Sequence, residues 1–163
     1  ELGPFHPHPA RPDESASPAD LAWWLRGERG WLRLSILVTP EPEPRLQQLA
    51  LRAVGDPSPA LRGAAERLLA CAAEPTPAWP ADLPAGGEVD AGAVLRSLRA
   101  GGARFGAMRL GLPIEGDGRV SSTFEIGSER GRLELKVALD PETGALTSAM
   151  LLVRAREAPA EGW

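Results

Sequence analysis

The sequence predicts an α+β protein of two tandem units, each a four-stranded antiparallel meander, with two helices before the second meander. A strand-like phrase, GERGWLRLSILVTPE at residues 27–41, is echoed by SERGRLELKVALDPE at residues 128–142. Two capped amphipathic stretches between the echoes favour helices, and short turns rich in glycine and proline separate the strands. These signals place the first unit at residues 1–54 and the second at residues 55–157.

The repeated phrase supplies one strand to each unit. Apolar residues occupy every second position from Leu32 to Val38, which is the period of a half-buried strand, and residues 133–139 follow the same pattern. The first copy is identical to the second at seven of fifteen positions: Glu28, Arg29, Gly30, Leu32, Leu34, Pro40 and Glu41. We therefore expect a core strand in each copy.

The stretch before the phrase is predicted to be its hairpin partner. Read alone, ADLAWWLRG at residues 19–27 is compatible with a helical turn, but its alignment with VSSTFEIGS at residues 120–128 predicts a strand. A hairpin loop at residues 27–30 then pairs apolar residues on one face. The predicted pairs are Leu25 with Leu32, Trp23 with Leu34, Leu21 with Ile36, Ile126 with Leu133, and Phe124 with Leu135.

Two helices are predicted between the echoed strands. Ser58 is a suitable cap and Pro59 a suitable first residue for a helix over about residues 58–74. Asp90 is a suitable cap for a helix over about residues 90–100, which we expect Gly101 and Gly102 to stop. With four strands over about residues 103–155 the second unit is complete, whereas the first unit has four strands and its helical part is absent.

Composition and single residues exclude several functions. The formal net charge of −4 offers no basic stripe for nucleic acid, and no apolar run approaches the ~20 residues of a membrane span. Cys71 is the only cysteine, so an intrachain disulfide is impossible, and His6 and His8 alone are too few for a metal site. No catalytic residue and no cofactor is predicted. The chain begins with Glu1 rather than Met, so we expect that a preceding segment was removed, and the compartment stays open.

The tryptophans of the first unit are the leading candidates for binding. Trp24 and Trp31 point away from the core face, and the hairpin register places Trp24 near Arg33 and Trp31 near Arg26. Both pairs suit cation–π contacts. The second copy has charged residues at the matching places, so we expect the aromatic face to be covered by other parts of the chain, a second chain or a ligand.

The second unit resembles known folds. The stretch FGAMRLGLPIEGDGRVSSTFEIGSERGRLELKVALDPETGALTSAMLLV, together with the helix before it, resembles the cystatin-like and nuclear-transport-factor-like cone folds, and is similar to accessory domains that precede β-lactamase-type serine hydrolases. The resemblance covers roughly residues 90–155 and, more faintly, 2–54. The tandem plan also resembles that of the β-lactamase-inhibitor proteins. This resemblance implies helices followed by a curved four-stranded sheet.

The leading hypothesis for function is a non-enzymatic binding or accessory module, which uses a curved sheet or the aromatic sheet face. Its partner would be a protein, a second copy of the chain or a small apolar ligand. One alternative is a small isomerase-like or cyclase-like enzyme, which the cone-fold resemblance implies, with a pocket between sheet and helices lined by Phe124 and Leu135. Another alternative is a structural dimerisation unit.

Overall fold

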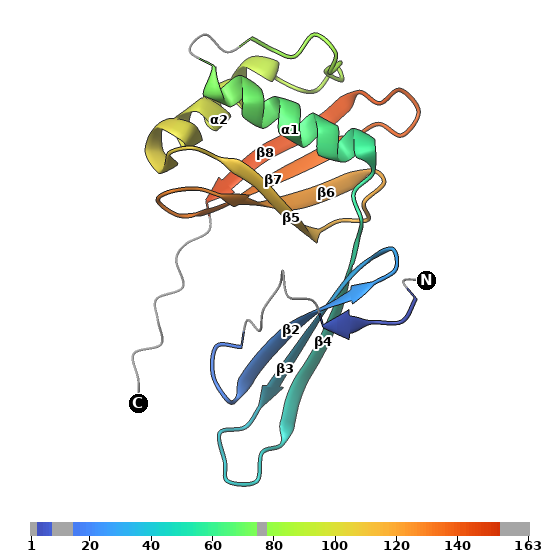
Figure 1. The fold of residues 1–163 in the computed structure, drawn as a ribbon, viewed down its shortest axis with the longest axis vertical. Helices are drawn as coiled ribbons and strands as arrows, with labels where there is room; N and C mark the ends of the chain where they lie inside the picture. Colours follow the sequence, from blue (N-terminus) through green and yellow to red (C-terminus); the bar gives the residue numbers. More distant parts are fainter. Residues whose placement is uncertain (1–2, 8–14, 75–77, 154–163) are drawn as a thin grey trace. The chain divides into compact units, whose positions relative to one another are not determined.

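The computed structural model describes residues 3–7, 15–74 and 78–153 of the 163-residue chain. The chain divides into two compact units, which meet in sequence between Asp56 and Pro57. Two four-stranded antiparallel sheets and two helices make up the described elements, with the helices between the sheets in chain order (Figure 1). The predicted α+β class with two antiparallel sheets is confirmed.

The first unit is a meander in the order β1-β2-β3-β4. Its strands are β1 (His6–Pro7), β2 (Asp20–Gly27), β3 (Gly30–Val38) and β4 (Leu46–Gly55). The strand predicted for residues 20–26 is therefore correct, and the three predicted pairs, Leu25–Leu32, Trp23–Leu34 and Leu21–Ile36, are all formed. Within residues 3–7 and 15–56 the structure contains strands and no helix.

The second unit carries both helices and the second sheet. Its elements are α1 (Pro59–Ala73), α2 (Ala91–Phe105), β5 (Arg109–Glu115), β6 (Ser121–Gly127), β7 (Arg132–Leu139) and β8 (Leu146–Val153). Both helices lie over the same face of the sheet (Figure 1), where α1 packs on β5 and β7 and α2 packs on β8. The side chains of Phe124, Ile126, Leu133, Leu135 and Val137 fill the core beneath them.

Helix α1 forms as the sequence predicts. The Ser58 hydroxyl accepts a hydrogen bond from the backbone N–H of Leu61 at 3.3 Å, and Pro59 occupies the first turn, where no backbone donor is needed. Its inward stripe consists of residues that are at most 9 % exposed: Leu61, Ala64, Ala65, Leu68, Leu69 and Ala72. The apolar stripe therefore fixes which side of the helix faces the sheet.

Helix α2 is longer than predicted. Asp90 caps it as expected, but it continues through Gly101 and Gly102 and ends at Phe105, with Gly106 as its C-cap at φ +85°. Gly101 does not break the helix because it is a site of close approach: a Cβ there would lie 2.3 Å from Cδ2 of Leu151 on β8. The expected stop at residues 101–102 is therefore wrong, and Gly106 ends the helix instead.

The two sheets share local features at matching places. A register shift falls between Leu37 and Val38 in the β3–β4 pair, and another between Ala138 and Leu139 in the β7–β8 pair. The residue just after each shift point makes the same backbone hydrogen bond at 2.9 Å, from Val38 N–H to the Ala19 carbonyl and from Leu139 N–H to the Val120 carbonyl. Because one extra residue lies on the fourth strand at each shift, Gln47 in β4 and Thr147 in β8, each sheet bends at the same point of its fourth strand.

Candidate functional site

The first sheet presents an apolar face made by one side of β2, β3 and β4. Strand register places the members opposite one another: Leu21 with Ile36, Trp23 with Leu34, Leu25 with Leu32, Ile36 with Leu49, Leu34 with Leu51, and Val38 with Leu46. We call these residues, with Ala53 opposite Leu32, the apolar face. It includes no charged or hydrogen-bonding side chain except the indole of Trp23.

The apolar face is most exposed along β4. Leu46, Leu49 and Leu51 are 63 %, 54 % and 62 % exposed. Their positions arise from two features of the sequence: the register shift at Val38 places Leu46 on the same side as Leu49 and Leu51, and the alternation after it keeps them there. Three large apolar side chains on one edge strand of a sheet make a contiguous patch, which is the usual mark of an interaction surface.

The matching face of the second sheet has the opposite environment. Leu146, which pairs with Leu139 just as Leu46 pairs with Val38, is fully buried. Leu151, the counterpart of Leu51, is half-buried against Gly101 of α2. The same strand pattern is therefore covered by helices in one unit and open to solvent along β4 in the other.

The opposite face of the first sheet carries the tryptophans that the sequence singled out. Strand register pairs Trp24 with Arg33 and Trp31 with Arg26, as expected. The Arg26 guanidinium lies over the Trp31 ring, 5.1 Å from its centroid. Both indoles are only 4 % exposed, so neither offers an open surface. A binding role for Trp24, Trp31, Arg26 and Arg33 stays a prediction.

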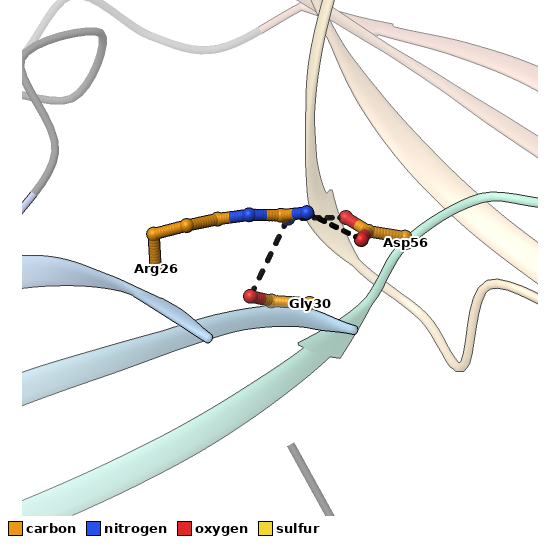
Figure 2. A network of polar contacts seen from close by, with 3 residues as sticks. All are labelled: Arg26, Gly30 and Asp56. Atoms are coloured by element: carbon orange, nitrogen blue, oxygen red, sulfur yellow. Dashed lines mark hydrogen bonds and ion pairs between the residues drawn. The ribbon is translucent and has the colours of Figure 1, made fainter. Parts of the chain in front are cut away.

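Arg26 is held by an acidic partner at the end of β4. Figure 2 shows its guanidinium reaching the Asp56 carboxylate through two hydrogen bonds, of 2.5 and 2.6 Å, and the Gly30 carbonyl at 3.4 Å. The hydrogen bonds and charge of Asp56 raise the pKa of Arg26 above its ordinary value. The backbone N–H of Asp56 also donates to the Arg29 carbonyl at 3.2 Å. This network ties the β2–β3 hairpin to the end of β4, which is a structural role.

The pocket expected for an enzyme is occupied by packed side chains. Phe124 and Leu135, the predicted lining residues, are fully buried between the second sheet and the helices, together with Val137. Glu134, the charged residue that the structure buries, alternates with them along β7 and so lies on the other face of that sheet, paired in register with Glu125. The buried acid Glu134 is therefore separated by the sheet from the predicted lining residues Phe124 and Leu135.

An open hollow of about 270 Å³ lies beside the turn between β7 and β8. Residues 86–88 and Thr147 line it together with Asp140 and Thr143. The Asp140 carboxylate already accepts hydrogen bonds from the backbone N–H groups of Glu142 and Thr143 and from the Thr143 hydroxyl, and these lower its pKa. Asp140 stabilises a turn in which Gly144 takes a positive φ of 69°, so the hollow is not a good candidate site.

Metal-ligating clusters and membrane-spanning helices are both absent from the described residues. Residues 3–7, 15–74 and 78–153 hold no cluster of three or more His, Cys, Asp or Glu side chains suited to a metal ion. His6 is exposed on β1, and His8 lies outside the described residues. Neither α1 nor α2, the helices of the described part of the chain, has the length and apolar character needed to cross a membrane.

The sequence reasoning missed Leu46, Leu49 and Leu51 as surface residues. Their alternation was visible in RLQQLALRAV, but alternation reports which side chains share a face and not what covers that face. The useful signal was the expected absence of helices from the first unit, because a strand face without its helices is left open.

No family model, curated protein or solved structure matches this chain.

Proposed function

We propose that the protein is a non-enzymatic binding module, and that the apolar face of its first sheet is the surface that binds a protein partner. The observation that carries the proposal is the exposure of Leu46, Leu49 and Leu51 at 54–63 % along one strand. Completing the burial of three such leucines on binding would contribute roughly 3 kcal/mol, a large share of a specific interaction. The proposal also includes a duplicated ancestry for the two sheets, which their matching pairings and register shifts support.

Two neighbouring residues of β4 provide a matched experiment. Leu49 belongs to the apolar face, whereas Gln48 pairs with Leu37 on the opposite face, and both side chains are exposed. A photo-crosslinking amino acid placed at residue 49 is expected to form a discrete protein adduct in cell extract, and the same group at residue 48 is not.

The adduct at residue 49 is also expected to disappear when Leu46 and Leu51 are both replaced by serine. Equal adducts from residues 48 and 49, or an adduct that survives the double replacement, would contradict the assignment of this face as the binding surface. Circular dichroism of each variant checks that the sheets remain folded.

A further inference from the structure

We infer that the occupant of the apolar face is an amphipathic helix of a separate partner protein, with an apolar inner stripe that includes a small residue. This inference rests on the proposed function and names the kind of partner. It is drawn from the second unit, where the corresponding strands show what such a face accepts.

The second sheet provides the precedent for a helix. Its strands β5, β7 and β8 are covered by α1 and α2, and the inward residues Leu61, Leu68 and Leu98 are at most 1 % exposed. The strand pairings beneath them match those of the first sheet, including the register shift beside Leu46 and Leu146. A sheet with the same pairings and the same local bend therefore offers a similar surface to a helix.

Close packing on the edge strand specifies one position of the helix. In the second unit Gly101 of α2 lies against Leu151, which pairs with Leu135. Leu51 pairs with Leu34 in the same way and is much more exposed. We therefore expect a glycine or alanine on the partner helix opposite Leu51, because a larger residue would hold the helix away from the sheet.

Charge specifies the rest of the stripe. The apolar face has no charged member, so a carboxylate on the inner side of the helix would lose its hydration without gaining a partner. In α1 the exposed Glu66 pairs with Arg62 at 3.8 Å, and the Arg62 guanidinium lies over the ring of Phe124, 5.9 Å from its centroid. Since Trp23 takes the place of Phe124 in the first sheet, we expect acidic residues only on the outer side of the helix, whereas an arginine opposite Trp23 is compatible with this face.

A peptide titration of the full chain tests the inference. The probe is a capped synthetic peptide with the sequence of residues 90–106, because α2 is the helix that covers β8, the counterpart of β4, and the control peptide has Leu98→Glu and Phe105→Glu. With methyl-labelled leucine, the probe is expected to shift the signals of Leu46, Leu49 and Leu51 in a saturable manner. Leu152, exposed on the second sheet, is the internal reference that stays unshifted.

Variants of the chain with serine on the apolar face give the expected change in the affinity for the probe. Replacing both Leu49 and Leu51 with serine is expected to weaken binding of the probe at least ~10-fold, the factor that corresponds to about 1.4 kcal/mol. Because both leucines are exposed, the variant keeps its fold, which circular dichroism verifies. Equal shifts from the probe and the control peptide would overturn the inference of an apolar helical stripe.

Sedimentation separates failure of the inference from failure of the proposed function. If the probe causes no shift and the chain is a dimer that the two serine replacements convert to a monomer, the occupant is a second copy of the chain. The inference then fails while the apolar face remains a protein-binding surface. If the probe causes no shift, the chain is a monomer, and residues 48 and 49 crosslink equally, both are overturned.

Discussion

The two sheets have the same strand order and matching apolar pairs, yet their apolar faces have different environments. Leu146 is fully buried beneath the helical layer of its own unit, whereas Leu46, at the matching position, is 63 % exposed. The alternation of apolar residues therefore defines a face that is stabilised by a covering layer, but it does not specify what forms that layer. In the second unit the chain supplies it as α1 and α2, and in the first unit we propose that a partner does.

Replacing Leu146 is expected to lower the free energy of unfolding far more than replacing Leu46. Leu146→Ala is expected to lower the free energy of unfolding of the second unit by about 2–5 kcal/mol, because it leaves a cavity in a packed core. Leu46→Ala is expected to change that of the first unit by less than about 0.5 kcal/mol, because its side chain already contacts water. Urea unfolding of both variants, followed by probes in each unit, checks the difference. Similar losses would mean that the first sheet is covered too.

Two adjacent glycines of α2 test how closely the helix must approach the sheet that it covers. Gly101→Ala is expected to destabilise the second unit by about 1 kcal/mol, because the new Cβ overlaps Leu151 and pushes the helix or that side chain away. Gly102→Ala meets only the end of Met108, at 3.8 Å, and is expected to stabilise α2 by up to about 1 kcal/mol. Thermal unfolding of both variants measures the effects. The same sign for both would show that close approach at Gly101 is unimportant.

The turns before β2 and β6 are expected to differ in their response to pH. Asp117 accepts hydrogen bonds from the backbone N–H groups of Arg119, Val120 and Ser121 at 2.8–3.0 Å, which lower its pKa. Since the folded-state pKa lies below the unfolded value, this stabilisation is fully present above the unfolded value, near 3.8, and is lost as pH falls through the folded one. Asp117→Ala is therefore expected to cost about 1 kcal/mol at neutral pH and progressively less in acid.

Ser17 provides the control in the first unit. Its hydroxyl accepts hydrogen bonds from the backbone N–H groups of Ala19 and Asp20 at 3.2 and 3.1 Å, and a hydroxyl carries no charge that titrates in this range. Ser17→Ala is expected to have a smaller cost that does not vary between pH 7 and pH 3. Unfolding curves across that range check both variants, and a cost for Asp117→Ala that is constant with pH would contradict the assignment.

The smallest expected effect concerns the ion pair of the first unit. The side chains of Arg26 and Asp56 are 32 % and 38 % exposed, so solvent screens their interaction. A double-mutant cycle with Arg26→Ala and Asp56→Ala is expected to give a coupling of about 0.5–1 kcal/mol. Arg26→Lys is expected to recover little of it, because an ammonium cannot form the paired hydrogen bonds or lie over Trp31 in the same way. Full recovery by lysine would show that charge alone matters.

Much of the fold follows from local rules that the sequence displays. The register of β2 and β3 was predictable because a shift by one residue would move Leu21, Trp23 and Leu25 off the apolar face. The start of α1 was predictable because Ser58 and Pro59 have local roles. The end of α2 was not, because a glycine that breaks a helix and a glycine that lets it approach a strand look alike until Leu151 is placed beside it.

The candidate site was less predictable than the fold. The sequence drew attention to Trp24 and Trp31 because the second copy has charged residues at the matching places, but the structure leaves both only 4 % exposed. The sequence did not single out the leucines of β4. Whether a leucine lies in a core or on an open face depends on elements far away in the sequence, and periodicity contains no information about them.

Solvent exposure of leucine methyl groups in the free protein shows directly whether the apolar face of the first sheet is open to solvent. With a soluble nitroxide added to the full chain, we expect strong broadening of the Leu46, Leu49 and Leu51 signals and little broadening of those of Leu133, Leu135 and Leu146. Equal protection of both sets would contradict it, because the apolar face of the first sheet would then be covered by the chain itself.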